Sequence, residues 1–168
     1  MEEAESIIDI NKNTYDKIAS KFKVVPIENE RNKFITNLRI GSLILDLGCG
    51  AGDDVKFFLG KKFKAIGIDN SKSMLESARK NVPNGDFREL DMLDLKFADA
   101  YFDAVWSKAS LIHIPKSVVK TVLSEVHRIL KSKGVIALIS RIPNIVKQHA
   151  IKHNFTVAKE KSVWSGSE

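Results

Sequence analysis

The chain alternates short apolar runs with segments in which apolar residues recur at helical spacing. Residues 43–47 and 64–69 are apolar runs that end at or near an acid, a pattern typical of buried parallel strands. Glycines at alternate positions in residues 48–52 allow a tight turn after the first run, and residues 53–59 supply one short helix. A strand, a glycine turn, a helix and a second strand within about thirty residues predict a nucleotide-binding βαβ unit.

The rest of the chain continues this alternation. Helical spacing predicts amphipathic helices over residues 5–22, 28–38, 72–82 and 115–130, and apolar runs predict strands over residues 86–90, 102–107 and 134–140. A last helix over residues 143–153 and a last strand over residues 155–163 follow. This order predicts an α/β fold with a Rossmann-like, doubly wound, mostly parallel sheet. We expect a single domain, residues 1–168, with an N-terminal helical segment at 1–40 and the core at 41–168.

Acids around the glycine turn indicate which nucleotide the unit binds. A dinucleotide site needs a third glycine where the helix faces a pyrophosphate, but that position is Asp53, followed by Asp54. Carboxylates there would repel a pyrophosphate and favour a cationic ligand, and Asp46 adds negative charge. Asp69, about twenty residues beyond the first strand, is placed to accept hydrogen bonds from ribose hydroxyls. S-adenosylmethionine is ribosylated, positively charged and free of phosphate, so an NAD-dependent oxidoreductase is disfavoured.

Four segments resemble the motifs of a known family. Residues 45–52 resemble at every position the first motif of the class I S-adenosylmethionine-dependent methyltransferases, and residues 66–71 resemble the second. Residues 91–95 and 102–107 are similar to the third and fourth motifs. One such motif alone is weak, but four in the right order and spacing are specific. The resemblance covers residues 15–140.

The resemblance implies S-adenosylmethionine as the cofactor and S-adenosylhomocysteine as its product. Asp46 and the backbone of Gly48 and Gly50 would hold the amino-acid end of the cofactor, and Asp69 would hold the ribose. The full set of predicted cofactor-binding residues is Tyr15, Asp46, Gly48, Cys49, Gly50, Asp69, Asn70, Met74, Asp91, Met92 and Ser107.

Several of these residues have an alternative structural role. In the family the N-terminal helix acts as a lid, from which Tyr15 would reach the methionine end of the cofactor. Alternatively, Tyr15 is a core residue. Met74 lies close to the expected adenine or is an ordinary core methionine. Asp91 would accept a hydrogen bond from the adenine amine, and the Met92 amide would donate one to the ring. Alternatively, Asp91 is a loop acid, and Asp94 could play the same part.

The expected chemistry demands few side chains. The acceptor attacks the methyl group in line, and the protein supplies proximity and alignment. A general base is required only if the acceptor must lose a proton, and His113, after the fourth strand, is the best-placed candidate. Alternatively, His113 packs its loop against the lid. We predict no metal site, because His149 and His153 lack a third ligand.

Composition limits the remaining possibilities. The chain has 168 residues, of which 43% are hydrophobic and 29% charged, as in an ordinary globular protein. No apolar run approaches the ~20 residues that span a bilayer, and the acidic N-terminus is unlike a signal peptide. Cys49 is the one cysteine, which excludes an internal disulfide, and we expect a cytoplasmic location. The net charge of +6 hints at an acidic partner, but the basic loop at residues 60–64 lacks the aromatic interleaving of a nucleic-acid platform.

The end of the chain departs from the family pattern. Complete members close with a sixth and a seventh strand, the seventh antiparallel beside the fifth, whereas the 168-residue chain leaves 28 residues after Ser140. We expect the seventh strand to be absent or reduced to residues 164–168. The sheet would then have an open edge, which a homodimer could pair, and the acceptor site would be shallow or completed by a partner.

We therefore expect a methyltransferase that acts on a small molecule or an accessible side chain. Residues 107–110 are not the Asn-Pro-Pro-Tyr type of box that grips exocyclic amines, and no second cysteine could attack C5 of a pyrimidine. The alternative is a non-catalytic subunit with the methyltransferase fold that stimulates another protein.

Overall fold

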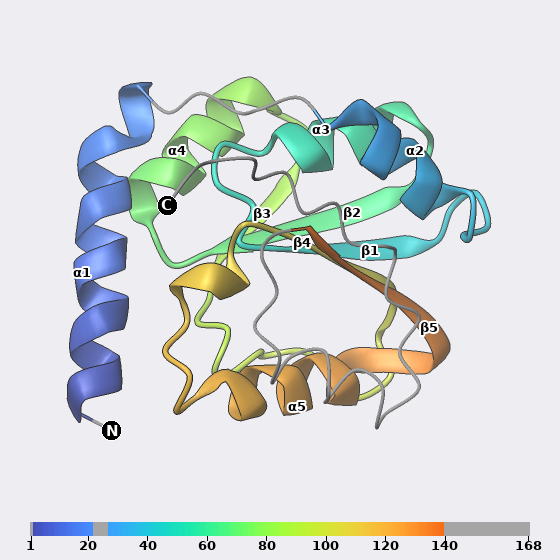
Figure 1. Ribbon diagram of the computed structural model, residues 1–168. Helices are drawn as coiled ribbons and strands as arrows, with labels where there is room; N and C mark the ends of the chain where they lie inside the picture. Colours follow the sequence, from blue (N-terminus) through green and yellow to red (C-terminus); the bar gives the residue numbers. More distant parts are fainter. Residues whose placement is uncertain (1, 22–26, 140–168) are drawn as a thin grey trace, which may run out of the picture.

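The computed structural model describes residues 2–21 and 27–139 and places five parallel strands between two layers of helices (Figure 1). The strands are β1 (Leu43–Leu47), β2 (Lys64–Asp69), β3 (Asp86–Glu89), β4 (Phe102–Lys108) and β5 (Leu130–Ile139). The helices are α1 (Glu2–Ile18), α2 (Glu28–Ile35), α3 (Asp53–Gly60), α4 (Lys72–Asn81) and α5 (Val119–Ile129), with short 3-10 helices η1 (Ala19–Lys21) and η2 (Leu111–His113).

The sheet has the order β3-β2-β1-β4-β5, and each neighbouring pair of these strands is parallel. The chain moves outward from β1 to β3 on one side, then crosses to β4 and β5 on the other. This order confirms the predicted α/β, Rossmann-like, doubly wound sheet. In such sheets ligands bind outside the carboxyl ends of the strands where the order reverses, which here is between β1 and β4.

Alternate residues of the strands pack into two separate cores. Leu45 on β1 belongs to a cluster with Val122 of α5, on one face of the sheet. Ile44 belongs to a second cluster with Phe34 of α2 and with Trp106, whose ring centroid lies 5.0 Å from that of Phe34. Helices thus cover both faces (Figure 1), which explains why the strands are continuous apolar runs rather than alternating ones.

The turn between β1 and α3 requires glycine at two positions. Gly48 has a φ of +81° and Gly52 a φ of +83°, in the left-handed region that favours glycine. A Cβ on Gly48 would collide with the side chain of Ser110, and one on Gly52 would collide with the ring of Phe87. Both the backbone conformation and the close neighbours therefore exclude a side chain at these two positions.

Local side-chain hydrogen bonds shorten the second helix. It was expected over residues 28–38 but ends at Ile35. The side chains of Thr36 and Asn37 both donate to the carbonyl of Lys33, which would otherwise accept the next backbone hydrogen bond of the helix.

The fifth helix and fifth strand also differ from the expected bounds. The helix begins at Val119 rather than at Pro115, because the carbonyl of Pro115 first closes a turn with the amides of Val118 and Val119. The strand begins at Leu130, directly after the helix. Residues 131–134, expected as the end of the helix, interrupt the register between β4 and β5.

The first helix stands outside the two layers. It runs over Glu2–Ile18 rather than residues 5–22, packs along α4 and η1 (Figure 1), and also hydrogen-bonds to His113 of η2. None of the described helices is long and apolar enough to cross a bilayer. Among the described strands β5 pairs with β4 alone, and the helix and strand predicted over residues 143–153 and 155–163 lie outside the described residues.

Candidate active site

A cavity of about 380 Å³ opens at the carboxyl ends of β1, β2 and β4. This volume lies in the range of roughly 300–1,000 Å³ that is typical of small-molecule sites. The predicted site residues that border it are Tyr15, Gly48, Cys49, Gly50, Asp69, Asn70, Met74, Asp91, Met92 and His113. Asp46 and Ser107 are the predicted residues that do not border it.

Asp69 is fixed at the tip of β2 by backbone amides. Its Oδ2 accepts a hydrogen bond from the amide of Gly50 at 2.9 Å, and its Oδ1 accepts one from the amide of Ser71 at 2.9 Å. Burial raises the pKa of this carboxyl, and the amide hydrogen bonds oppose the rise. The carboxylate thus joins the glycine turn to the start of α4 at the edge of the cavity.

Asp46 is buried at the end of β1, with 1% of its surface exposed. Among the described residues its Oδ2 has no hydrogen-bond partner. Burial, followed by the charges of Asp54 and Asp69, raises its pKa well above the ordinary value, while Lys108 and Arg31 oppose this. The sequence analysis counted Asp46 as a negative charge, whereas the folded environment raises its pKa and so disfavours the charged form.

Asp54 is neutralised by two cations. It is 4% exposed, its Oδ1 accepts a hydrogen bond from Nε of Arg31 at 2.5 Å, and its Oδ2 lies 3.0 Å from Nζ of Lys108. The expectation that Asp54 repels phosphates as an open charge is therefore wrong. Arg31 on α2 and Lys108 at the end of β4 supply counter-charges that sequence reasoning did not connect to it.

Ser107 contacts the site through its neighbour Ser110. The two hydroxyl oxygens lie 2.5 Å apart, and Oγ of Ser110 donates to the carbonyl of Leu47 at 2.7 Å. Ser110 borders the cavity, whereas Ser107 is buried. The serine pair thus ties the loop after β4 to the tip of β1.

The first helix contacts the loop after β4 through two side chains. The Tyr15 hydroxyl lies 2.7 Å from Nε2 of His113, with the rings edge to face, and Nδ2 of Asn11 donates to the His113 carbonyl at 3.0 Å. Burial lowers the pKa of His113, so its imidazole is neutral at pH 7. His113 therefore borders the cavity and packs its loop against α1, the second of the two alternatives left open by the sequence.

A third contact ties α1 to α4. Oδ1 of Asp16 accepts hydrogen bonds from Oγ of Ser71 at 2.5 Å and from the amide of Ser73 at 3.2 Å. Ser71 is the N-cap of α4, and its Oγ also accepts from the amide of Met74. Burial of Asp16 opposes ionisation, but the hydrogen bonds outweigh it and lower the pKa. One helix thus spans the cavity from the loop after β4 to the loop after β2.

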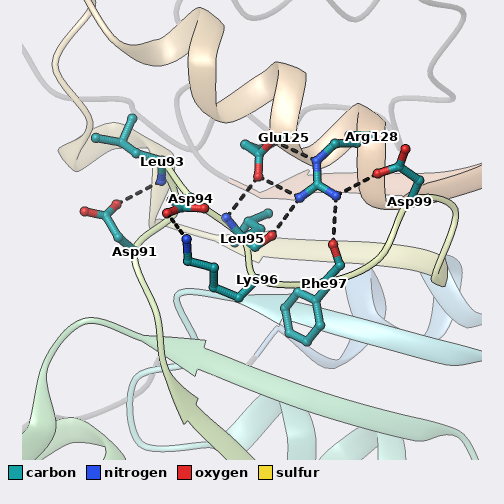
Figure 2. Close-up of polar contacts among 9 residues, drawn as sticks. All are labelled: Asp91, Leu93, Asp94, Leu95, Lys96, Phe97, Asp99, Glu125 and Arg128. Carbon is teal, nitrogen blue, oxygen red and sulfur yellow. Dashed lines mark hydrogen bonds and ion pairs between the residues drawn. The ribbon is translucent and has the colours of Figure 1, made fainter.

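The loop after β3 begins at the cavity with Asp91 and Met92. Oδ1 of Asp91 accepts a hydrogen bond from the amide of Leu93 at 2.8 Å, so this carboxylate also closes a turn (Figure 2). Farther along, the loop is held by Glu125 and Arg128 of α5.

Sequence reasoning missed the apolar part of the cavity wall. Its isoleucines come from four separate elements, and they are Ile8, Ile27, Ile114 and Ile139. Asn11 was also missed, although Ile8, Asn11 and Tyr15 fall at helical spacing on one face of α1. That spacing was the signal that could have identified them together.

The described part of the site offers no cluster of metal ligands and no activated thiol. Within residues 2–21 and 27–139, no group of three or more His, Cys, Asp or Glu side chains could hold a metal ion. Burial, followed by the charge of Asp46, raises the pKa of Cys49 well above its ordinary value, so this thiol is not activated as a nucleophile.

Known proteins match most of this chain. A family model described as a methyltransferase domain matches residues 44–134. A demethylmenaquinone methyltransferase of Symbiobacterium thermophilum is 31% identical over 141 residues, which covers 71% of this chain and 54% of that protein. An uncharacterised methyltransferase of Synechocystis sp. is 29% identical over 119 residues, covering 71% of this chain and 53% of that protein. The chain spans about half the length of these relatives.

A solved structure has the same fold. The crystal structure of a TehB-like S-adenosylmethionine-dependent methyltransferase from Corynebacterium glutamicum matches with a TM-score of 0.68 and 16% identity. The match covers 89% of this chain and 83% of that chain.

Proposed function

Because this chain belongs to the class I S-adenosylmethionine-dependent methyltransferase family, we propose that it transfers a methyl group from this cofactor to a small-molecule acceptor. One observation carries the proposal: three of the sequence motifs and the loop that follows the fourth border one cavity, at the ends of four different strands. They contribute the Gly48 turn after β1, Asp69 after β2, Asp91 after β3 and the His113 loop after β4.

The residues at the cavity fit the cofactor. Gly48 and Gly50 of this turn border the cavity and have no side chains, so a ligand can approach the main chain there. This backbone would hold the amino-acid end, Asp69 the ribose hydroxyls and Asp91 the adenine amine. Met74 borders the cavity with 1% of its surface exposed and offers an apolar contact for the base.

The bound cofactor supplies a methyl group on a positively charged sulfur. Tyr15 and His113 would take the proton of an acceptor hydroxyl. With His113 neutral and Nε2 unprotonated, the Tyr15 hydroxyl donates to Nε2 and its oxygen can accept from the acceptor. As the acceptor attacks, its proton passes to the Tyr15 oxygen and the Tyr15 proton to His113, which becomes an imidazolium. The sulfur keeps the electron pair of the broken bond, so atoms and charge balance.

An apolar acceptor with an acidic hydroxyl suits the remaining wall. Ile8 and Ile114 border the same cavity as Tyr15 and His113. A relative that is named a demethylmenaquinone methyltransferase supports an acceptor of the reduced quinone type.

Titration calorimetry tests the cofactor, and methyl transfer tests the acceptor. We expect S-adenosylmethionine and S-adenosylhomocysteine to bind and NAD and ATP not to bind. With labelled S-adenosylmethionine, reduced naphthoquinones should be methylated and a polycarboxylate such as aconitate should not. Binding of NAD in place of S-adenosylmethionine would refute the assignment. Tight cofactor binding without transfer to any acceptor, together with a stable complex with another protein, would favour the non-catalytic subunit.

A further inference from the structure

The loop between β3 and β4, residues 90–101, has no helix or strand of its own. It starts at the cavity, where Leu90, Asp91 and Met92 form part of the wall. The backbone N–H and C=O groups of such a segment need partners from elsewhere. Two side chains of α5 supply them (Figure 2).

Arg128 holds the loop with its whole guanidinium. Nη1 donates to the carbonyl of Phe97 at 2.7 Å and to Oδ1 of Asp99 at 2.8 Å, and Nη2 donates to the carbonyl of Leu95 at 2.7 Å. Nε and Nη2 donate to the two carboxylate oxygens of Glu125 at 2.9 and 2.8 Å. A guanidinium carries five N–H donors in one rigid plane, and these contacts use each of them.

Glu125 completes the arrangement, which we call the Glu125–Arg128 clamp. Its Oε2 also accepts a hydrogen bond from the amide of Leu95 at 3.0 Å. The clamp thus holds both backbone polar groups of Leu95, whose side chain is 1% exposed in the core. The hydrogen bonds from Arg128 lower the pKa of Glu125, and Glu125 raises the pKa of Arg128, so both stay charged.

A tight turn connects the clamp to the cavity. The amide of Leu93 donates to Oδ1 of Asp91, and the amide of Asp94 donates to the carbonyl of Asp91 at 3.2 Å. These bonds close the chain between Asp91 and Leu95 on itself. A shift of Leu95 is therefore passed to Asp91 and Met92 rather than absorbed between them.

We propose that the Glu125–Arg128 clamp positions the adenine end of the cofactor site and sets its preference for adenine. The clamp fixes the loop so that the Asp91 carboxylate and the Met92 amide meet the amine and the ring nitrogen of the base. This inference rests on the proposed function, because it presupposes an adenosine ligand. Glu125 and Arg128 do not border the cavity, so they are positioning residues.

The test compares ligands that differ only at the base. Affinities of S-adenosylhomocysteine and S-inosylhomocysteine, in which an oxygen replaces the adenine amine, are measured by calorimetry for the full chain and for Arg128→Met, Arg128→Lys and Glu125→Gln. Lys131→Met is the matched control, since Lys131 pairs with Asp103 at 2.8 Å and makes no contact in the clamp. Hydrogen exchange of the amides of residues 92–97 reports whether the loop is released.

We expect Arg128→Met to bind S-adenosylhomocysteine about tenfold more weakly, the size of one charge-assisted hydrogen bond. The ratio of the two affinities should fall toward one, with faster exchange in the loop. A merely structural role would weaken the binding of both ligands equally and leave the ratio of their affinities unchanged. That result would overturn the inference. If Arg128→Met does not fold, Arg128→Lys keeps the positive charge but lacks the planar set of guanidinium donors. An unchanged ratio of the two affinities in Arg128→Lys would also overturn the inference. Failure of the unaltered chain to bind S-adenosylhomocysteine would overturn the proposed function as well.

Discussion

The hydroxyl of Tyr15 lies 2.7 Å from Nε2 of His113, although 98 residues separate them in the sequence. The contact joins α1 to η2 at the wall of the cavity and pairs a phenol with a neutral imidazole. Within the described residues, no other tyrosine or histidine borders the cavity. Under the proposed function these two groups are the candidates for taking a proton from an acceptor.

His113→Gln should lower kcat by about 100-fold or more, the usual contribution of a positioned general base. Affinity for S-adenosylhomocysteine should change little, because the side chain acts on the acceptor. Tyr15→Phe should lower kcat as well, since it removes the hydroxyl between acceptor and imidazole. Steady-state kinetics with calorimetry separates the two effects, and His127→Gln, on the exposed side of α5, is the control. An unchanged kcat would remove His113 from the reaction.

The acid limb of the pH–rate profile should lie below pH 6.5, the ordinary pKa of histidine. Burial lowers the pKa of His113 in the folded chain, so the neutral base persists to more acidic pH than in a free imidazole. The unfolded state then binds more protons just below pH 6.5, so folding stability is present above that pH and is lost as pH falls through the folded pKa. Profiles of kcat and thermal unfolding from pH 5 to 8 check both. An acid limb above pH 6.5 would contradict this prediction.

Asp69→Asn should weaken binding of S-adenosylhomocysteine by about 1–3 kcal/mol, the cost of a disrupted hydrogen bond to a charged group. The change removes the charge that the amides of Gly50 and Ser71 hold in place at the cavity edge. Calorimetry measures the affinity. Asp86→Asn, at an exposed surface pair with Arg88, should leave it unchanged. Equal affinity in both variants would remove Asp69 from the cofactor site.

Asp46→Asn should separate stability from cofactor binding. Because the pKa of Asp46 is raised in the folded chain, its contribution to stability is lost as pH rises through that pKa. The asparagine cannot ionise, so the variant should gain thermal stability relative to the native chain, and the gain should grow as the pH rises from the ordinary aspartate pKa toward the raised pKa of the folded chain. Affinity for S-adenosylmethionine should fall at the same time, if Asp46 serves the cofactor's amino group. A variant that is less stable at every pH would show that the carboxyl is required for folding.

Asp16→Ala should loosen α1, because it removes the acceptor for Ser71 and for the amide of Ser73. Loss of one such hydrogen bond costs about 0.5–1.5 kcal/mol. The dissociation rate of S-adenosylhomocysteine should rise accordingly in stopped-flow measurements. Asp9→Ala, exposed on the same helix, is the matched control. Equal dissociation rates would show that α1 does not cover the bound cofactor.

Local pattern was sufficient for most of the fold. The apolar run that closes on Asp69 predicted the bounds of β2, because a strand buried on both faces needs an unbroken apolar sequence. The end of α2 was missed because Thr36 and Asn37 compete for a single carbonyl, which periodicity does not detect.

Non-local pairing limited what could be predicted of the site. Motif spacing placed Asp69 and His113 at the cavity, since each follows a strand of known direction. The pairing of Asp54 with Arg31 and Lys108 depends on how α2 and β4 pack against α3, and no local signal encodes that. The burial of Asp46 was missed for the same reason: charge was counted from the sequence without the counter-ions and the solvent exposure that the fold decides.

The position of α1 bears on the pace of catalysis. The helix touches the segments on both sides of the cavity through Asn11, Tyr15 and Asp16. If it covers a bound nucleoside, those hydrogen bonds must break before the spent cofactor escapes, so we expect S-adenosylhomocysteine to be released slowly and to be a strong inhibitor.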